Sequence, residues 1–187
     1  PVVMGSRSTL VKASLGGFEG RALKAGDVVP IQPVEPGARF RPLGLPEGYK
    51  APAYGGRHEI RVILGPQHGA FSEEAIEALW SASYVIALDS DRMGYRLEGP
   101  PIEHRAGPDI VSDGNPLGAV QVPGDGIPII LLADRGTTGG YTKIATVIST
   151  DVGKLAQAVP GQSVTFKAVT IEEAYRLRRE REGALVA

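Results

Sequence analysis

The stretch "GAVQVPGDGIPIILLAD", Gly118 to Asp134, contains two apolar runs separated by the turn-forming residues "PGDG". Short runs rich in valine and isoleucine, bounded by proline, glycine and aspartate, are typical of β-strands. A connection of this composition favours a tight hairpin. We therefore expect two neighbouring antiparallel strands here, in a chain whose architecture is set by strands.

Similar strand patterns lie on both sides of this hairpin. Residues 2–15 alternate loosely and are expected to form a strand that ends at the Gly16-Gly17 turn, and residues 20–29 predict a tight turn that feeds another strand. Clear strand patterns also occur in "HEIRVILGP" (58–66), at both ends of "YVIALDSDRMGYRLEG" (84–99), in "KIATVIST" (143–150) and in "QSVTFKAV" (162–169). Short strands separated by turn residues predict a closed or nearly closed β-barrel.

The best helical pattern is "SEEAIEALWSA", residues 72–82. Ser72 is a good N-cap residue, and the two glutamates that follow it suit the first turn of a helix. Ile76, Leu79 and Trp80 recur at helical spacing, so we expect this face of the helix to pack against the barrel.

Two further helices are expected near the C-terminus. A short one should begin at Asp151 and stop at Pro160-Gly161. A charged one should follow in residues 170–183, opened by a capping box of Thr170 and Glu173. With so few helices, the predicted fold class is mainly β: a barrel with a few peripheral helices.

Composition excludes several kinds of function. The 20 basic and 21 acidic residues nearly cancel, so no basic surface for nucleic acid is expected. The chain has no cysteine, which excludes disulfides and thiolate chemistry. His58, His68 and His104 form no spaced metal motif, so no metal site is expected. No apolar run approaches the roughly 20 residues of a membrane span. A cytoplasmic protein is therefore the default expectation.

Polar residues gather where predicted strands end. Such clusters are "GSRST" (5–9), "DSDRMGYRL" (89–97), "SDG" (112–114) and "ADRGTTGGY" (133–141). Each one taken alone is also typical of an ordinary turn or an exposed edge strand. Taken together they place three aspartates at or after strand ends, accompanied by Arg7, Arg92 and Arg135. Because a barrel brings strand ends together at its rims, we expect these groups to converge on one mouth.

The residue types in these clusters suit a small amide or carboxylate ligand. Arginine binds a planar anion with two hydrogen bonds, and aspartate can bind an amide N–H or act as a base. The two candidates for proton handling are Asp91 and Asp134. The expected substrate-binding residues are Arg92, Tyr95, Asp113, Gln121, Thr137, Thr138, Gly139, Gly140 and Tyr141. No phosphate-binding loop ending in Gly-Lys-Ser/Thr and no G-x-S-x-G nucleophile elbow is present.

Several ordered motifs resemble the biotin-dependent carboxyltransferase family. They are "LGGFEGRALKAGD", "RVILGPQ", "SDRMGYRL" and the long string from "GAVQVPGDG" to "DRGTTGGY", and the resemblance runs from about Gly5 to Tyr175. The family includes the C subunit of bacterial 5-oxoprolinase, also known as a Kip-type antagonist of a sporulation-kinase inhibitor. It also includes the region called allophanate hydrolase subunit 2 in urea carboxylase. Two departures occur: relatives are expected to have glutamine at Gly136 and proline at Thr142.

The resemblance implies a cyclophilin-like β-barrel and a longer parent protein. Residues 1–57 would then be the end of an N-terminal barrel region plus a connector rich in proline and glycine, and residues 58–187 the barrel domain. The start of the chain in an apolar run without methionine fits this expectation. Implied partners are a protein like the B subunit of 5-oxoprolinase and a third, lactam-handling subunit.

Three functions follow from the resemblance. The first is a subunit of an ATP-dependent 5-oxoprolinase, which opens the cyclic amide 5-oxoproline to glutamate and is not active alone. The second is biotin-dependent carboxyl transfer to urea or a related amide, with the biotin carried by another protein. The third is a non-catalytic protein that binds a sporulation-kinase inhibitor. A prolyl isomerase role rests on fold analogy alone.

Overall fold

The computed structural model describes residues 2–31, 33, 44, 55 and 57–186. The chain divides into two compact units, residues 1–43 and 44–187, which are described separately. Most of the predicted connector at 30–57 lies outside the described residues, and the division of the chain at residue 57 stays a prediction.

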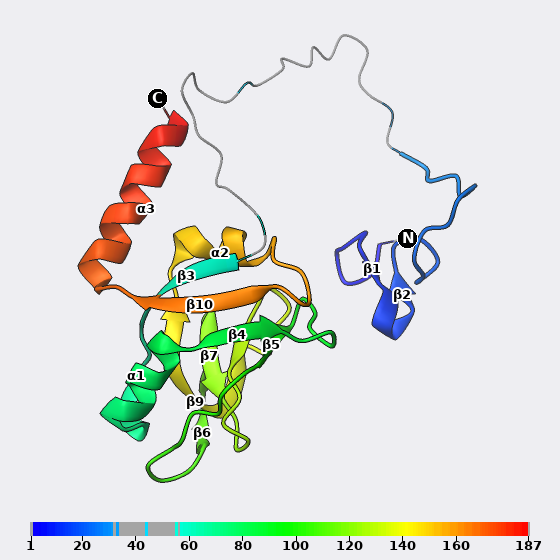
Figure 1. Cartoon of the computed structure of the whole chain (residues 1–187). Helices are drawn as coiled ribbons and strands as arrows, with labels where there is room; N and C mark the ends of the chain where they lie inside the picture. The colour runs from blue at the N-terminus through cyan, green and yellow to red at the C-terminus, as the bar shows by residue number, and fades with distance from the viewer. Residues whose placement is uncertain (1, 32, 34–43, 45–54, 56, 187) are drawn as a thin grey trace. The chain divides into compact units, whose positions relative to one another are not determined.

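The second unit is a closed barrel of seven strands with one further strand at its side (Figure 1). Around the barrel the strands follow the order β3, β10, β4, β5, β8, β7, β9, and β9 pairs with β3 to close the ring, while β6 pairs with β9 outside it. Only β10 and β3 run parallel among these pairs. The strands are β3 (Arg57–Leu64), β4 (Ser83–Ile86), β5 (Gly94–Glu98), β6 (Asp109–Gly114), β7 (Ala119–Val122), β8 (Ile129–Leu131), β9 (Thr138–Val147) and β10 (Ser163–Ala168).

The predicted mainly β barrel with a few peripheral helices is confirmed. The hairpin predicted at 118–134 is β7 and β8, with Val120 opposite Ile130 and Gln121 opposite Ile129. The interior of the barrel is filled by buried aliphatic and aromatic side chains from all seven of its strands, among them Ile60, Tyr84, Val120, Ile144 and Phe166. Their removal from water is the main source of stability for such a fold.

Helix α1 (Glu73–Ser81) forms as the sequence predicts. Its cap is Ser72, whose Oγ accepts a hydrogen bond of 3.1 Å from the backbone N–H of Ala75. Leu79 is fully buried, and Ile76 and Trp80 pack against the barrel core. The predicted packing face is therefore confirmed.

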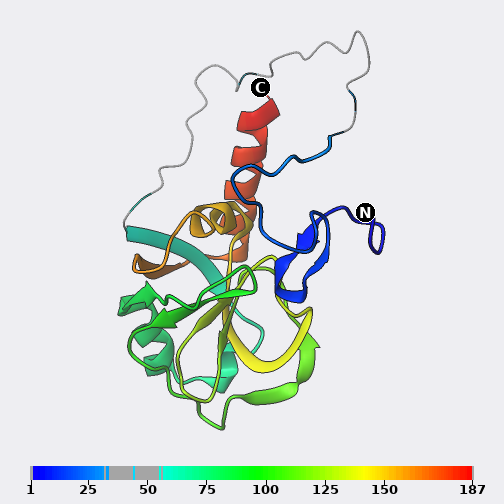
Figure 2. The same ribbon diagram turned by 90° about the vertical axis from the view of Figure 1, so that its right-hand side faces the viewer.

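Helices α2 (Ser149–Leu155) and α3 (Ile171–Val186) follow β9 and β10. α2 lies at one end of the barrel and β6 towards the other (Figures 1 and 2). The prediction that Asp151 begins α2 is wrong by two residues, because Asp151 is buried inside the first turn and its carboxylate binds Arg61. Thr170 does cap α3, accepting from Glu173 N at 3.2 Å.

In the first unit, residues 2–31 form short extended pieces. β1 (Thr9–Leu10) and β2 (Leu15–Gly16) pair across a 3₁₀ turn at Val11–Ala13. The predicted strand over residues 2–15 is therefore wrong for most of its length, and no strand is present in 20–29, all of which is described. The fold turns too tightly here for long strands: a Cβ on Gly17 would lie 1.9 Å from Thr9 Oγ1.

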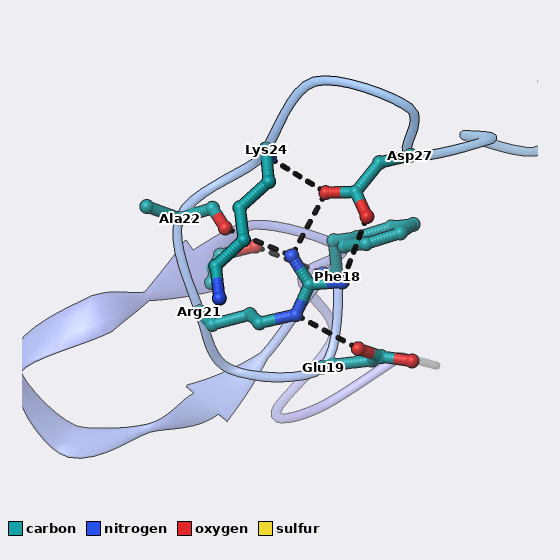
Figure 3. A network of polar contacts seen from close by, with 7 residues as sticks. Phe18, Glu19, Arg21, Ala22, Lys24 and Asp27 are labelled. Carbon is teal, nitrogen blue, oxygen red and sulfur yellow. Dashed lines mark hydrogen bonds and ion pairs between the residues drawn. The ribbon is translucent and has the colours of Figure 1, made fainter.

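A polar network connects residues 18–27 of this unit. The Arg21 guanidinium forms two hydrogen bonds with Asp27, at 2.8 and 2.9 Å, and one of 2.9 Å with Glu19 (Figure 3). It also lies over the Phe18 ring, 4.8 Å from the centroid, a favourable cation–π arrangement. These contacts lower the pKa of Asp27 to about 2, chiefly through Arg21. The motif "GGFEGRALKAGD" is thus a fold determinant of this unit.

Candidate functional site

Strand β6 places the predicted "SDG" cluster directly beside the predicted "TTGGY" cluster. Asp113 pairs with Gly139 and Gly114 with Thr138, while Asp109 pairs with Tyr141. The ladder is irregular between Asp109 and Asp113. The sequence therefore brings two of its polar clusters together on neighbouring strands, although it predicts a turn where β6 forms.

Lys143, on β9, is the most unusual residue near these clusters. Its side chain is 1% exposed, and its Nζ atom is buried without a hydrogen-bond partner. The nearest counter-charge is Asp113, whose Oδ2 lies 3.5 Å from Nζ and whose side chain is 57% exposed. A buried amine with unused donors is costly unless something binds it, so this geometry suits a ligand oxygen.

Gln67 joins Lys143 to Asp113 from the loop after β3. Its Nε2 donates to Asp113 Oδ2 at 3.4 Å, and its Oε1 accepts from the backbone N–H of Lys143 at 3.2 Å. Gln67, Asp113 and Lys143 are called the amine cluster below. They come from three separate segments of the chain, which meet because both β3 and β6 pair with β9.

The pKa of Asp113 lies below its usual range. The largest cause is the hydrogen bond of 2.7 Å from Gly114 N to Asp113 Oδ1, followed by the nearby Lys143. Asp113 is therefore ionised at neutral pH, and it can accept a hydrogen bond from an amide N–H without first losing a proton.

Asn115 and Gln121 form a second buried polar pair close to the amine cluster. Gln121 pairs with Lys143 across β7 and β9, and its Nε2 donates to Asn115 Oδ1 at 3.0 Å. Asn115 Nδ2 in turn donates to the carbonyl of Gly136 at 3.1 Å. A Cβ on Gly139 would lie 2.7 Å from that Nδ2 atom, so glycine is required at 139 for this close approach.

Asp134 and Arg92 form a separate, exposed ion pair. Arg92 Nε lies 2.8 Å from Asp134 Oδ2 and Nη2 lies 3.0 Å from Oδ1, with the side chains 76% and 52% exposed. A main-chain hydrogen bond connects the same two segments, since the backbone N–H of Asp134 donates to the Arg92 carbonyl at 2.8 Å. Asp91 shapes its own turn through Oδ1, which accepts from Met93 N at 2.7 Å.

The remaining predicted residues are placed as follows. Tyr95 donates its hydroxyl to the Ala158 carbonyl at 2.9 Å, in the loop after α2, and burial raises its pKa. Tyr141 is 42% exposed beside β6. Arg135 donates from Nε to the Asn115 carbonyl at 2.8 Å. Arg7 belongs to the first unit, which is described by itself. That the predicted residues line one cavity stays a prediction.

The polar clusters that the sequence shows at strand ends do not include Lys143, Asn115 or Gln67. Lysine is the residue type that is least often buried, so a lysine in a strand is ordinarily assigned to the solvent face. Gln67 precedes a loop histidine and ends the family-like motif "RVILGPQ", which assigns it no role by itself. One local pattern does bear on Lys143: the near-continuous apolar run "IATVI" that follows it is typical of a strand buried on both faces. Thr142 and Lys143 are both buried in that strand.

Thr142 marks one departure from the expected family pattern. It is buried, and its Oγ1 lies 3.0 Å from His104 Nε2. His104 also packs against Phe71, with ring centroids 4.7 Å apart. The threonine hydroxyl therefore forms a hydrogen bond with His104 that a proline at this position could not form.

Among the described residues, no group of three or more potential ligands is placed to hold a metal ion. Likewise, no described helix is both long and apolar enough to span a membrane.

The sequence of the chain is similar to those of several known proteins. The chain is 39% identical over 182 residues to the C subunit of 5-oxoprolinase from Escherichia coli (strain K12), covering 97% of this chain and 56% of that protein. Identity to the corresponding C subunit from Haemophilus influenzae is also 39%, over 187 residues. Urea amidolyase of Lachancea kluyveri is 30% identical over 205 residues, which are 99% of this chain and 11% of that protein.

The fold of the chain is also similar to that of a solved structure. The urea carboxylase of Kluyveromyces lactis superposes with a TM-score of 0.81 at 28% identity, covering 99% of this chain and 18% of that one. The chain spans about half the length of the 5-oxoprolinase subunits it matches. The family model described as the carboxyltransferase domain, subdomains A and B, matches residues 1–168. The chain therefore belongs to the carboxyltransferase domain family.

Proposed function

We propose that this chain is part of a 5-oxoprolinase subunit and supplies the mouth that binds the cyclic amide. The identity to two 5-oxoprolinase C subunits supports this proposal. The structural observation that carries it is the buried Lys143 Nζ, without a hydrogen-bond partner and 3.5 Å from the ionised Asp113. A donor beside an acceptor matches the carbonyl and N–H of one amide group.

The chemistry of ring opening suits this pair. Water adds to the lactam carbon, the C–N bond breaks, the carbon keeps the hydroxyl as a carboxyl group, and the nitrogen leaves as an amine after gaining a proton. Negative charge develops on the carbonyl oxygen during the addition. Lys143 Nζ would donate to that oxygen and stabilise the developing charge. Asp113 would accept the lactam N–H, and Gln67 would hold Asp113 in place.

Proton handling is assigned to Asp91 or Asp134, as the sequence predicts. If Asp134 handles the proton, its carboxylate also accepts two hydrogen bonds from Arg92. Both oxygens of Asp134 are engaged in these bonds, so the ion pair competes with proton transfer at this carboxylate. The substrate carboxylate would be oriented by Arg92 or Arg135, and a carbonyl oxygen would meet Thr137, Thr138 and the backbone N–H groups of Gly139 and Gly140.

The proposed partners are a protein like the B subunit of 5-oxoprolinase and a lactam-handling subunit, and the single chain is expected to be inactive. ATP is assigned to the complex and not to the amine cluster, because Asp113 would repel a triphosphate there. A cytoplasmic location stays a prediction from the sequence.

The second candidate is carboxyl transfer between biotin and urea or a related amide. The family description and the 30% identity to a urea amidolyase favour it. An amide that presents N–H to Asp113 and its carbonyl to Lys143 would fit the same cluster. The biotin would arrive on another protein. The regulatory role, binding of a sporulation-kinase inhibitor, stays a prediction from the resemblance.

One reconstitution separates these candidates. The full-length parent protein is mixed with its B-type and lactam-handling partner subunits, and glutamate formation from 5-oxoproline is measured with and without ATP. A parallel reaction supplies a biotin carboxylase, a biotin carrier and labelled bicarbonate, with urea as acceptor. ATP-dependent glutamate without label transfer supports the proposal. Label in urea without glutamate would replace it with the second candidate.

A further inference from the structure

We infer that Asn115 is the positioning residue that fixes the binding loop at Gly136 to Gly139, an inference that rests on the proposed function of the same mouth. Asn115 is 7% exposed and lies between β6 and β7. Nothing in its sequence context, "SDGNPLG", indicates more than a turn.

All four hydrogen-bonding groups of Asn115 are engaged. Its backbone N–H donates to the Thr137 carbonyl at 2.8 Å, and its own carbonyl accepts from Arg135 Nε at 2.8 Å. Its side-chain Nδ2 donates to the Gly136 carbonyl at 3.1 Å, and Oδ1 accepts from Gln121 Nε2 at 3.0 Å. A buried asparagine with every group satisfied is well suited to hold one conformation.

Three of these bonds go to consecutive loop residues, Arg135, Gly136 and Thr137. The loop then enters β9, where Gly139 packs so close to the Asn115 amide that no Cβ fits. Asn115 therefore sets where the chain starts β9, and with it the position of Gly139 opposite Asp113.

The fourth bond connects Asn115 to strand β7, which pairs with the strand that carries Lys143. Gln121, which donates to Asn115 Oδ1, is the strand partner of Lys143. Asn115 thus connects the loop that carries the predicted threonines with the strand pair that carries the buried amine. A displacement of about 1 Å between such groups can reduce a rate by about a hundredfold.

The two ends of the Asn115 side chain can be tested separately. Asn115→Asp keeps an oxygen for Gln121 but loses the Nδ2 donor and faces the Gly136 carbonyl with an oxygen. Asn115→Ala loses both bonds. If the bond to Gly136 positions the loop, both variants should reduce kcat alike, by at least about tenfold, with KM changed less than about threefold. Thermal stability should fall more in Asn115→Ala. Ser72→Ala, which removes the N-cap of α1 and no bond of Asn115, is the control for lost stability alone.

A second readout does not depend on activity. Amide hydrogen exchange at Gly136 to Gly140 should be at least about tenfold faster in Asn115→Asp than in the parent, and unchanged in Ser72→Ala. Unchanged exchange in Asn115→Asp, or a kcat loss that merely follows the melting temperature across the three variants, would overturn the inference. If the parent complex forms no glutamate while exchange still rises in Asn115→Asp, the proposed function fails and the positioning role stands.

Discussion

At the scale of single residues, Asp134 has two candidate roles, proton handling and stabilisation of its turn. Its carboxylate forms two hydrogen bonds with Arg92, yet both side chains are more than half exposed. Exposed pairs of this kind contribute about 0–1 kcal/mol to stability. We expect Asp134→Asn to change the melting temperature little and to lower turnover in the complete complex by about a hundredfold or more, if this group handles the proton. Steady-state glutamate formation checks this. Turnover within a few fold of the parent, with folding intact, would reduce Asp134 to a structural turn residue.

Single residues also show where sequence reasoning stops. The run from Thr137 to Gly140 could be singled out, because glycines and small polar residues at a strand end are visible locally, and its binding role stays a prediction. Lys143 could not, since its burial depends on the pairing of β9 with β7 and on Gln67 from a distant loop. The apolar run that follows it indicates a buried strand but not which way the lysine faces.

At the scale of elements, the buried pair between β3 and α2 explains a wrong boundary. Asp151 has the residue type of an N-cap, but it is 1% exposed and accepts three hydrogen bonds from Arg61, including one from the Arg61 backbone N–H. This tertiary pairing moves the helix start to Ser149. Similarly, β6 forms from turn-like residues because β9 offers an edge for pairing. The strands of the barrel were predictable because each has its own apolar pattern.

The same pair predicts a dependence of stability on pH. Burial by itself would raise the pKa of Asp151, but the hydrogen bonds from Arg61 outweigh it and the pKa is lowered. The unfolded chain, with an aspartate pKa of about 3.9, binds the proton more readily. The contribution of this pair is therefore complete above about pH 4 to 5 and is lost as the pH falls through the lower folded pKa.

Urea unfolding can measure this contribution. Asp151→Ala leaves Arg61 partly buried without its partner, and we expect a loss of about 3–5 kcal/mol in the free energy of unfolding at pH 7. The difference between variant and parent should shrink towards pH 3. An equal difference at both pH values would contradict the assignment of the pKa shift to folding.

At the scale of the whole molecule, we expect a site that works only in an assembly. The chain covers 56% of the length of the 5-oxoprolinase C subunits it matches, and the amine cluster pairs its one amine with a carboxylate that would repel a triphosphate. We therefore expect the purified single chain to form no glutamate from 5-oxoproline with ATP. Activity at the level of the complete complex would contradict this expectation. The family and the barrel could be predicted from ordered motifs, whereas the identity of the substrate depends on contacts between segments that no local pattern reports.

Whether the amine cluster is the working site can be tested by measuring glutamate formation in the reconstituted complex carrying Lys143→Met. The control is Lys167→Met, on β10, where the lysine is 60% exposed and lies 3.9 Å from Glu59. Because Lys143 Nζ has no hydrogen-bond partner and Asp113 stays solvated, its replacement should leave stability unchanged or higher. We predict that Lys143→Met lowers ATP-dependent turnover by at least about a hundredfold while Lys167→Met stays within about twofold. Equal turnover of a folded Lys143→Met complex and the control would show that the amine cluster is not the working site.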